Sequence, residues 1–166
     1  MSSQQQPSAA DGIGIGIAFM ATGAYFILVG FGVLPVPGGQ DAVHGPAAVI
    51  VAAGAAFLFA GVAAAIRAKS GAADRDNDLP AESSAIAHAA YRIAGIAVAG
   101  SLAAIGTWIA IGAGPRAFTI SAPMFEMRTT GEMIGRTVFG LGAVVVWIYV
   151  IALTVQTVRK LFGRRG

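Results

Sequence analysis

Four long apolar segments that contain neither Asp nor Glu constrain this chain most strongly; they lie at about residues 12–36, 47–66, 85–111 and 137–158. A helix rises about 1.5 Å per residue, so about 20 apolar residues cross the ~30 Å hydrocarbon core of a bilayer. Only 11% of the residues are charged and the mean hydropathy is +0.73, whereas a soluble domain carries about 25% charged residues. The sequence therefore predicts an all-α integral membrane bundle of four transmembrane helices in two hairpins.

The rest of the chain divides around these segments. Residues 1–11 are polar and lack Lys and Arg, so we expect a disordered cytoplasmic tail there and not a secretory signal. Residues 12–162 form the expected transmembrane domain, and residues 163–166 form a basic tail. The second segment is so rich in Ala that its insertion energy is small, and we expect other helices to surround it.

The distribution of Lys and Arg predicts the orientation. Residues 67–84 carry three of them and residues 159–165 carry four, whereas the first connection, residues 37–46, carries none. The third connection and its border carry three: Arg116, Arg128 and Arg136. Because basic residues are enriched on the cytoplasmic side, both termini and the second connection are expected in the cytoplasm of a bacterial inner membrane.

The polar residues offer no catalytic or metal-binding pattern. The chain has no Cys, and His44 and His88 fall on opposite sides of the membrane in this topology. We therefore predict that the protein is not an enzyme and holds no cofactor and no metal. The sequence pI of about 9.8 does not predict nucleic-acid binding, because the basic residues border apolar segments, where they set topology.

Small residues recur at helical spacing within the segments. Gly16, Gly23 and Gly30 are seven residues apart, and so are Gly54 and Gly61. Gly95 begins a further stripe with Ala99 and Ala103. Small residues on one helix face let another helix approach closely, so these positions predict helix packing.

Two groups of polar side chains lie inside or beside the segments. His88 and Arg92 are four residues apart on one helix face, near the expected cytoplasmic end. Arg92 is expected to anchor the helix by reaching the headgroups, and the alternative is contact with a lipid phosphate or another anion together with His88. Trp147 and Tyr149 lie near the middle of the last segment, so their N–H and O–H groups are expected to face other helices.

The connections carry further local predictions. Pro35 and Pro37 are expected to end the first helix, and Asp78 is a candidate cap for the third. In the third connection, residues 112–135, we expect a short extended stretch over the sequence FTISAPMFEM. Glu132 and Arg136 are spaced for a local ion pair at the start of the fourth segment.

Two sequence blocks carry a resemblance: WIAIGAGPRAF at residues 108–118 and GRTVFGLGA at residues 135–143. Together they resemble a pattern in uncharacterised small four-helix bacterial inner-membrane proteins. This chain departs from the pattern with Ile111 in place of Phe and Pro115 in place of an acidic residue. The resemblance implies no activity; it singles out as possible functional or interface positions Trp108, Arg116, Phe118, Arg136 and Phe139.

Two functions fit these observations. The first is a non-catalytic accessory or structural subunit that packs in the bilayer against another membrane protein or against itself. The alternative is a small transporter component or oligomeric channel, with residues 112–135 at its periplasmic mouth. The alternative requires a continuous polar path through Thr22, Ser101 and Thr107.

Overall fold

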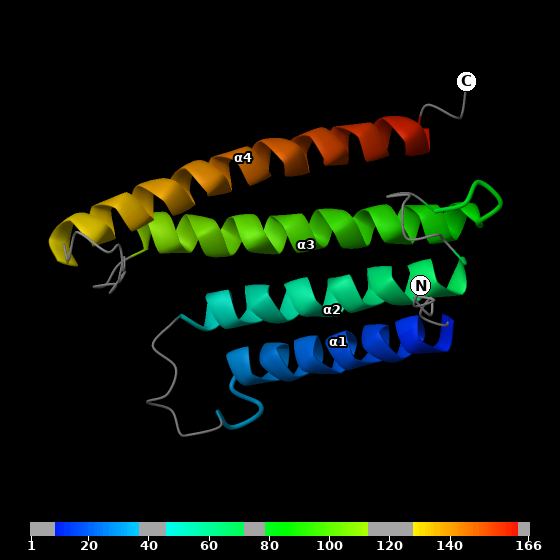
Figure 1. The fold of residues 1–166 in the computed structure, drawn as a ribbon, viewed down its shortest axis with the longest axis horizontal. Coiled ribbons are helices and arrows are strands. Elements are labelled where there is room, and N and C mark those ends of the chain that lie inside the picture. The colour runs from blue at the N-terminus through cyan, green and yellow to red at the C-terminus, as the bar shows by residue number, and fades with distance from the viewer. Residues whose placement is uncertain (1–8, 37–45, 72–78, 113–127, 163–166) are drawn as a thin grey trace, which may run out of the picture.

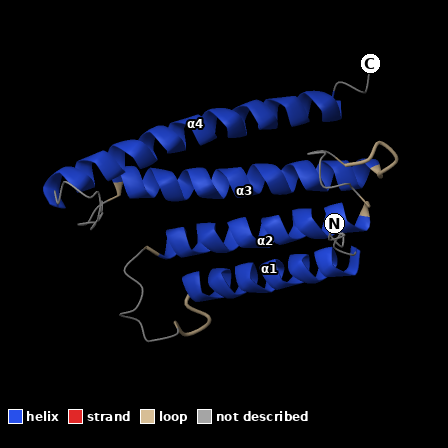
Figure 2. Cartoon of the chain, viewed as in Figure 1, coloured by secondary structure: helices blue, strands red, loops and turns tan. Residues whose placement is uncertain are grey.

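The computed structural model describes residues 9–36, 46–71, 79–112 and 128–162, and these contain four helices and no strand. The helices are α1 (Ala9–Gly30), α2 (Ala47–Lys69), α3 (Ala85–Ile111) and α4 (Arg128–Phe162). Each is long and apolar enough to cross a membrane, in α4 over Met133–Lys160. The predicted all-α fold with four membrane-spanning helices is confirmed (Figure 2).

The four helices lie side by side in the order of the sequence, and neighbours run in opposite directions (Figure 1). In the described parts of the chain, α1 contacts α2, α2 contacts α3, and α3 contacts α4, but no other pair of helices meets. The start of α1, the end of α2, the start of α3 and the end of α4 lie at one end (Figure 1). The two hairpins thus form an open row, with the Ala-rich α2 between two other helices as expected.

Glycines bring α1 and α2 into backbone contact. A methyl group at Gly61 would lie 2.5 Å from the carbonyl oxygen of Gly16. One at Gly54 would lie 2.7 Å from the carbonyl oxygen of Gly23, and one at Gly30 would lie 2.6 Å from a methyl of Val51. The seven-residue spacing therefore corresponds to a continuous contact line between the two helices, where any side chain would hold them apart.

The end of α1 differs from the prediction. The helix stops at Gly30, before Pro35, because Gly32 has a φ of +71°, which glycine adopts without strain. The N–H of Gly32 donates to the carbonyl of Val29 at 2.9 Å, and that of Val33 donates to Leu28 at 2.9 Å. This is a Schellman motif, which satisfies the last carbonyls of a helix. The prolines therefore follow the stop and do not cause it.

Three further features of the helix starts differ from the predictions. The Oγ of Ser84 accepts the N–H of Ala87 at 3.1 Å, so Ser84 caps α3 and Asp78, outside the described residues, is not the cap. Helix α4 begins at Arg128, about nine residues before the predicted start, because the polar sequence there continues the helix beyond its apolar part. Likewise α1 begins at Ala9, inside the expected tail. The expected extended stretch, residues 118–127, and the side chain of Glu132 lie outside the described residues.

Small side chains also join α3 to α4. Ala103 of α3 is fully buried, and Ala143 of α4 is 6% exposed. A methyl group at Gly106 would lie 3.3 Å from the Cβ of Ala143, slightly closer than an ordinary contact. Among the described residues no large side chain is fully buried. The row is thus joined by pairwise small-residue contacts and has no shared centre of large side chains.

Candidate functional site

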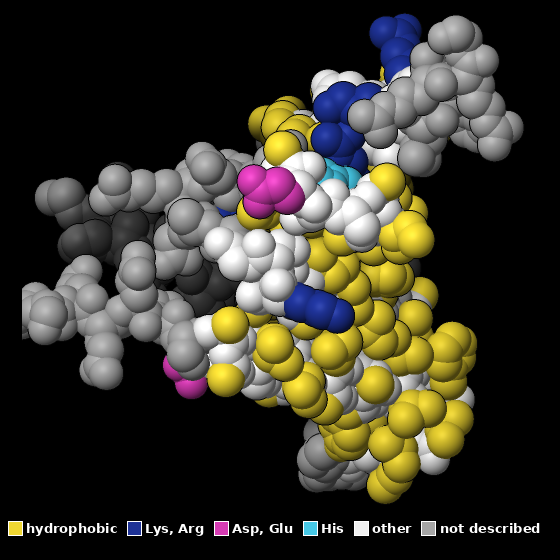
Figure 3. Space-filling model, turned by 90° about the vertical axis from the view of Figure 1, so that its right-hand side faces the viewer, with side chains coloured by type: hydrophobic (Ala, Val, Ile, Leu, Met, Phe, Trp, Pro, Cys, Tyr) yellow, Lys and Arg dark blue, Asp and Glu magenta, His cyan; other side chains and the backbone are white. Residues whose placement is uncertain are grey.

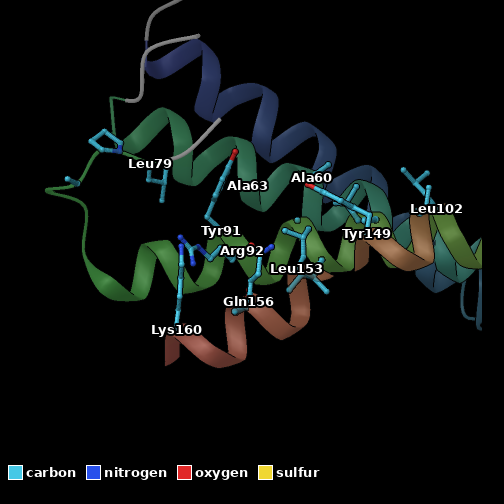
Figure 4. A pocket seen from close by; sticks show the side chains of 18 of the residues that line it. Ala60, Ala63, Leu79, Tyr91, Arg92, Leu102, Tyr149, Leu153, Gln156 and Lys160 are labelled. Atoms are coloured by element: carbon cyan, nitrogen blue, oxygen red, sulfur yellow. The ribbon is translucent and has the colours of Figure 1, made fainter. Parts of the chain in front are cut away.

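A groove of about 1440 Å³ lies along α3, with α2 on one side and α4 on the other (Figure 4). We call it the α3 groove. Its floor includes Gly95 and Ala99 of α3, and Ala60 and Ala63 of α2 form part of one wall. These residues are small, so they leave space where larger side chains would close the seam between the two hairpins.

The end of the α3 groove nearest the α2–α3 connection carries positive charge. Arg92 of α3 and Lys160 of α4 both line this end, beside Leu79 (Figure 4). Leu79 is buried and Arg92 is half-buried, whereas Lys160 is exposed. Two cations that approach one opening from different helices produce a local positive potential.

The remainder of the groove is mostly apolar. Leu102 lies at the far end, and Leu153 of α4 lines the wall between (Figure 4). Val146 of α4 also lines the groove. Three polar side chains interrupt this wall, Tyr149, Gln156 and Thr157. Thr157 is buried, and neither Gln156 nor Tyr149 has a hydrogen bond to any described residue. The groove therefore changes along its length from cationic, through polar, to apolar.

Trp147 has the partner that its position predicts. Its Nε1 donates to the Oγ1 of Thr107 at 3.1 Å, and that hydroxyl donates to the carbonyl of Ala103 at 2.7 Å. This chain of hydrogen bonds crosses from α4 to α3 and satisfies the indole N–H within the apolar region. Tyr149 lines the α3 groove and is 57% exposed, so its ring faces the space between helices.

The residues singled out in the sequence lie in different places. Arg92 lines the groove but His88 does not; the Nδ1 of His88 is 3.2 Å from the carbonyl oxygen of Ser84 on its own helix. Gly95, expected at a helix contact, faces open space, because a methyl group there would meet no atom within 4 Å. The packing expected at Gly95 is therefore not found, since this part of α3 forms the groove floor and Ala103 makes the contact with α4.

The residues carried by the resemblance lie at the opposite end of the α3–α4 pair. Trp108 is in the last turn of α3, and Arg136 and Phe139 are near the start of α4. The Nε of Arg136 is buried and donates no hydrogen bond, although the side chain has other interactions. Arg116 and Phe118 lie outside the described residues. The three described positions thus share one end of a helix pair, away from the α3 groove.

The polar residues that the channel alternative requires are not brought together. Thr22 lies on α1, where its hydroxyl donates to the carbonyl of Ala18 at 2.9 Å. Ser101 and Thr107 lie on α3, and α1 and α3 do not meet in the described parts of the chain. A path through these three residues therefore cannot run within one copy.

No family model, curated protein or solved structure matches the chain. The site must therefore be judged from its own chemistry. Within the described ranges, no three His, Asp or Glu side chains are close enough to hold a metal ion together. The α3 groove combines a concave surface, positive charge at one end and a mostly apolar lining along the rest of its length.

Sequence reasoning found Arg92 but missed the groove around it. Lys160 contributes to the sequence argument only as one of the basic residues that set topology. Gln156 gave a weak signal, since a polar side chain in an otherwise apolar segment needs a partner. The residues that line the groove come from three helices, so no local spacing could have brought them together.

Proposed function

We propose that the protein is a non-catalytic accessory or structural subunit that associates with another membrane protein in the plane of the bilayer. The observation that carries the proposal is the open row. A self-contained four-helix bundle encloses its inward side chains between all four helices, whereas here α1 and α4 do not meet. Both edges of the row therefore remain available to a partner.

The exposed edges consist of large apolar side chains. On α4 they include Leu141 and Val145, each 65% exposed, and on α1 Ile15 and Ile17, 54% and 56% exposed. Lipid tails accept such side chains as well as a protein does, so exposure alone does not select a partner. Association through an edge is testable by placing a bulkier side chain there. Fluid lipid tolerates such a side chain, but a closely packed partner helix does not.

Affinity purification of the tagged chain in mild detergent, with the mass and identity of co-purified proteins, tests the subunit proposal. We expect a larger membrane protein in fixed ratio. Val145→Trp on α4 or Ile17→Trp on α1 should lower its recovery severalfold. Ile93→Trp is the control, because Ile93 is 53% exposed on the inner helix α3 and does not line the groove.

Two results would overturn the subunit proposal. One is a monomer that brings no partner in several detergents. The other is a homo-oligomer without any other protein, which would favour the channel alternative with residues 112–135 at its periplasmic mouth. In that case the flux of small solutes through reconstituted vesicles becomes the relevant measurement.

We also propose that the end formed by the start of α1 and the end of α4 faces the cytoplasm of a bacterial inner membrane. Dark-blue Lys and Arg side chains are visible on this end of the molecule (Figure 3). The last turns of α2 and α4 carry Arg67, Lys69, Arg159 and Lys160. The positive-inside rule supports this orientation. Fusion of alkaline phosphatase or green fluorescent protein to the C-terminus tests it: fluorescence without phosphatase activity is expected, and the reverse would contradict it.

A further inference from the structure

We infer that the α3 groove binds one anionic phospholipid, whose headgroup lies at Arg92 and Lys160 and whose acyl chains follow the apolar part. The cationic end is the first support. Both side chains line the same opening, and Figure 4 shows them on facing helices, α3 and α4. The guanidinium carries five N–H donors, so Arg92 can bind a lipid phosphate alongside the interaction that it already makes.

The length of the groove is the second support. On α4 the lining runs from Lys160 to Val146, which is about 21 Å along the helix axis at about 1.5 Å per residue. One leaflet, with its headgroups, is about 20–22 Å thick, half of the 40–45 Å of a whole bilayer. A lipid that enters from the leaflet at the basic end would therefore fill the groove from its headgroup to the ends of its chains.

The order of the side chains along the groove is the third support. Gln156 lies one turn from Lys160, about 6 Å deeper, where a phospholipid carries the ester oxygens that accept hydrogen bonds. Beyond it the wall is apolar at Leu153 and Val146, and the ring of Tyr149, with its hydroxyl group, lies between them along the helix. A phosphate ion would occupy only the cationic end and leave the apolar length uncovered, whereas a phospholipid matches the whole sequence of cationic, polar and apolar surface.

Gly95 provides a way to close the groove without disturbing the fold. It lies on the floor, and a methyl group there would meet no atom within 4 Å. A Leu side chain at this position would occupy the space that the acyl chains require. Gly100 is the matched control, because it is also inside α3 with nothing within 4 Å and does not line the groove.

The experiment measures lipid binding to the purified full chain by native mass spectrometry, with phosphatidylglycerol, phosphatidylcholine and inorganic phosphate as probes. We expect one phosphatidylglycerol bound in preference to phosphatidylcholine. Lys160→Gln and Arg92→Gln should each weaken it about fivefold, the value expected for loss of one basic residue at an anionic lipid. Arg159→Gln is the matched control, since the neighbouring residue has the same charge and depth but lies outside the groove.

Further results distinguish a phospholipid bound in the groove from unspecific surface attraction and from a bound phosphate ion. Gly95→Leu should abolish the preferred binding while Gly100→Leu retains it. Equal losses for Lys160→Gln and Arg159→Gln would overturn the proposal in favour of unspecific surface attraction. Equal binding of phosphatidylglycerol and phosphatidylcholine would also overturn the proposal. So would inorganic phosphate that displaced phosphatidylglycerol from the groove, because the acyl chains would then contribute nothing to binding. Lipid binding is measured on the isolated chain, so its outcome is independent of whether a protein partner exists.

Discussion

The substitution Gly23→Ala tests the contact line between α1 and α2 most directly. Gly23 is buried, and its added methyl group would meet the backbone nitrogen of Leu58 and lie 2.5 Å from the carbonyl oxygen of Gly54. These are backbone atoms of a regular helix and cannot rotate away. An ordinary contact distance is about 3.5 Å, so the helices must separate by about 1 Å locally.

The cost follows from that separation. A gap of about 1 Å removes a quarter to a half of each dispersion contact around it, and overpacking of this kind costs about 1–3 kcal/mol. Replacing Gly by Ala inside a helix returns about 0.5–1 kcal/mol. The net destabilisation expected for Gly23→Ala is therefore about 0–2.5 kcal/mol, centred near 1 kcal/mol.

Gly14→Ala is the matched control, since Gly14 lies on the same helix with no atom within 4 Å of an added methyl group. It should stabilise by about 0.5–1 kcal/mol, because only the helix preference changes. Unfolding of both variants by SDS in mixed micelles, followed by far-ultraviolet circular dichroism, measures the difference. If Gly23→Ala proved as stable as Gly14→Ala, the close backbone contact would be refuted.

Three further substitutions test local features with the same assay. Trp147→Phe removes the donor to Thr107 and should lower the free energy of unfolding by about 0.6–1.7 kcal/mol. A double-mutant cycle with Thr107→Val should show coupling between the two positions. Additive losses would contradict the hydrogen bond between Trp147 and Thr107. Ser84→Ala removes the cap of α3 and should cost about 1 kcal/mol, while Ser83→Ala, outside the cap, should change little. Gly32→Ala places a side chain at a φ of +71° and should lower the free energy of unfolding by about 1–2 kcal/mol. An unchanged midpoint of the SDS unfolding transition would argue against the Schellman motif.

The α1–α2 contact could be predicted from the sequence because it depends on one local property. Glycines at seven-residue spacing on both segments leave two narrow faces without side chains, and close approach is then limited only by backbone. The same reasoning failed at Gly95, although it starts a similar stripe. A small residue permits a close contact but does not require one. At Gly95 no atom lies within 4 Å of an added methyl group, and the absent side chain leaves space in the groove.

Helix ends were less predictable than helix interiors. The start of α3 agrees with the prediction at Ala85, but the predicted cap does not. Ser84 directly precedes the helix and its Oγ accepts the N–H of Ala87, whereas Asp78 stands farther back in the sequence and outside the described residues. The start of α4 was placed too late because apolar content marks the membrane-spanning part, whereas the hydrogen-bonded helix continues to Arg128. Hydropathy predicts what the bilayer covers, and backbone geometry decides where the helix stops.

The contacts within each hairpin and the groove between the hairpins should respond separately to mutation. The Gly23 contact joins α1 to α2, and the groove floor at Gly95 lies on α3, which α1 does not meet in the described parts of the chain. Both sites involve α2, but Gly23 meets its Gly54 and Leu58, whereas Ala60 and Ala63 line the groove. Sites that share no contacting residue have nearly additive effects. Gly23→Ala should therefore lower stability with lipid preference unchanged, and Gly95→Leu should remove lipid preference with stability retained. If either variant changed both quantities, the seam between α2 and α3 would have to transmit strain, and the two hairpins could not be treated as independent units.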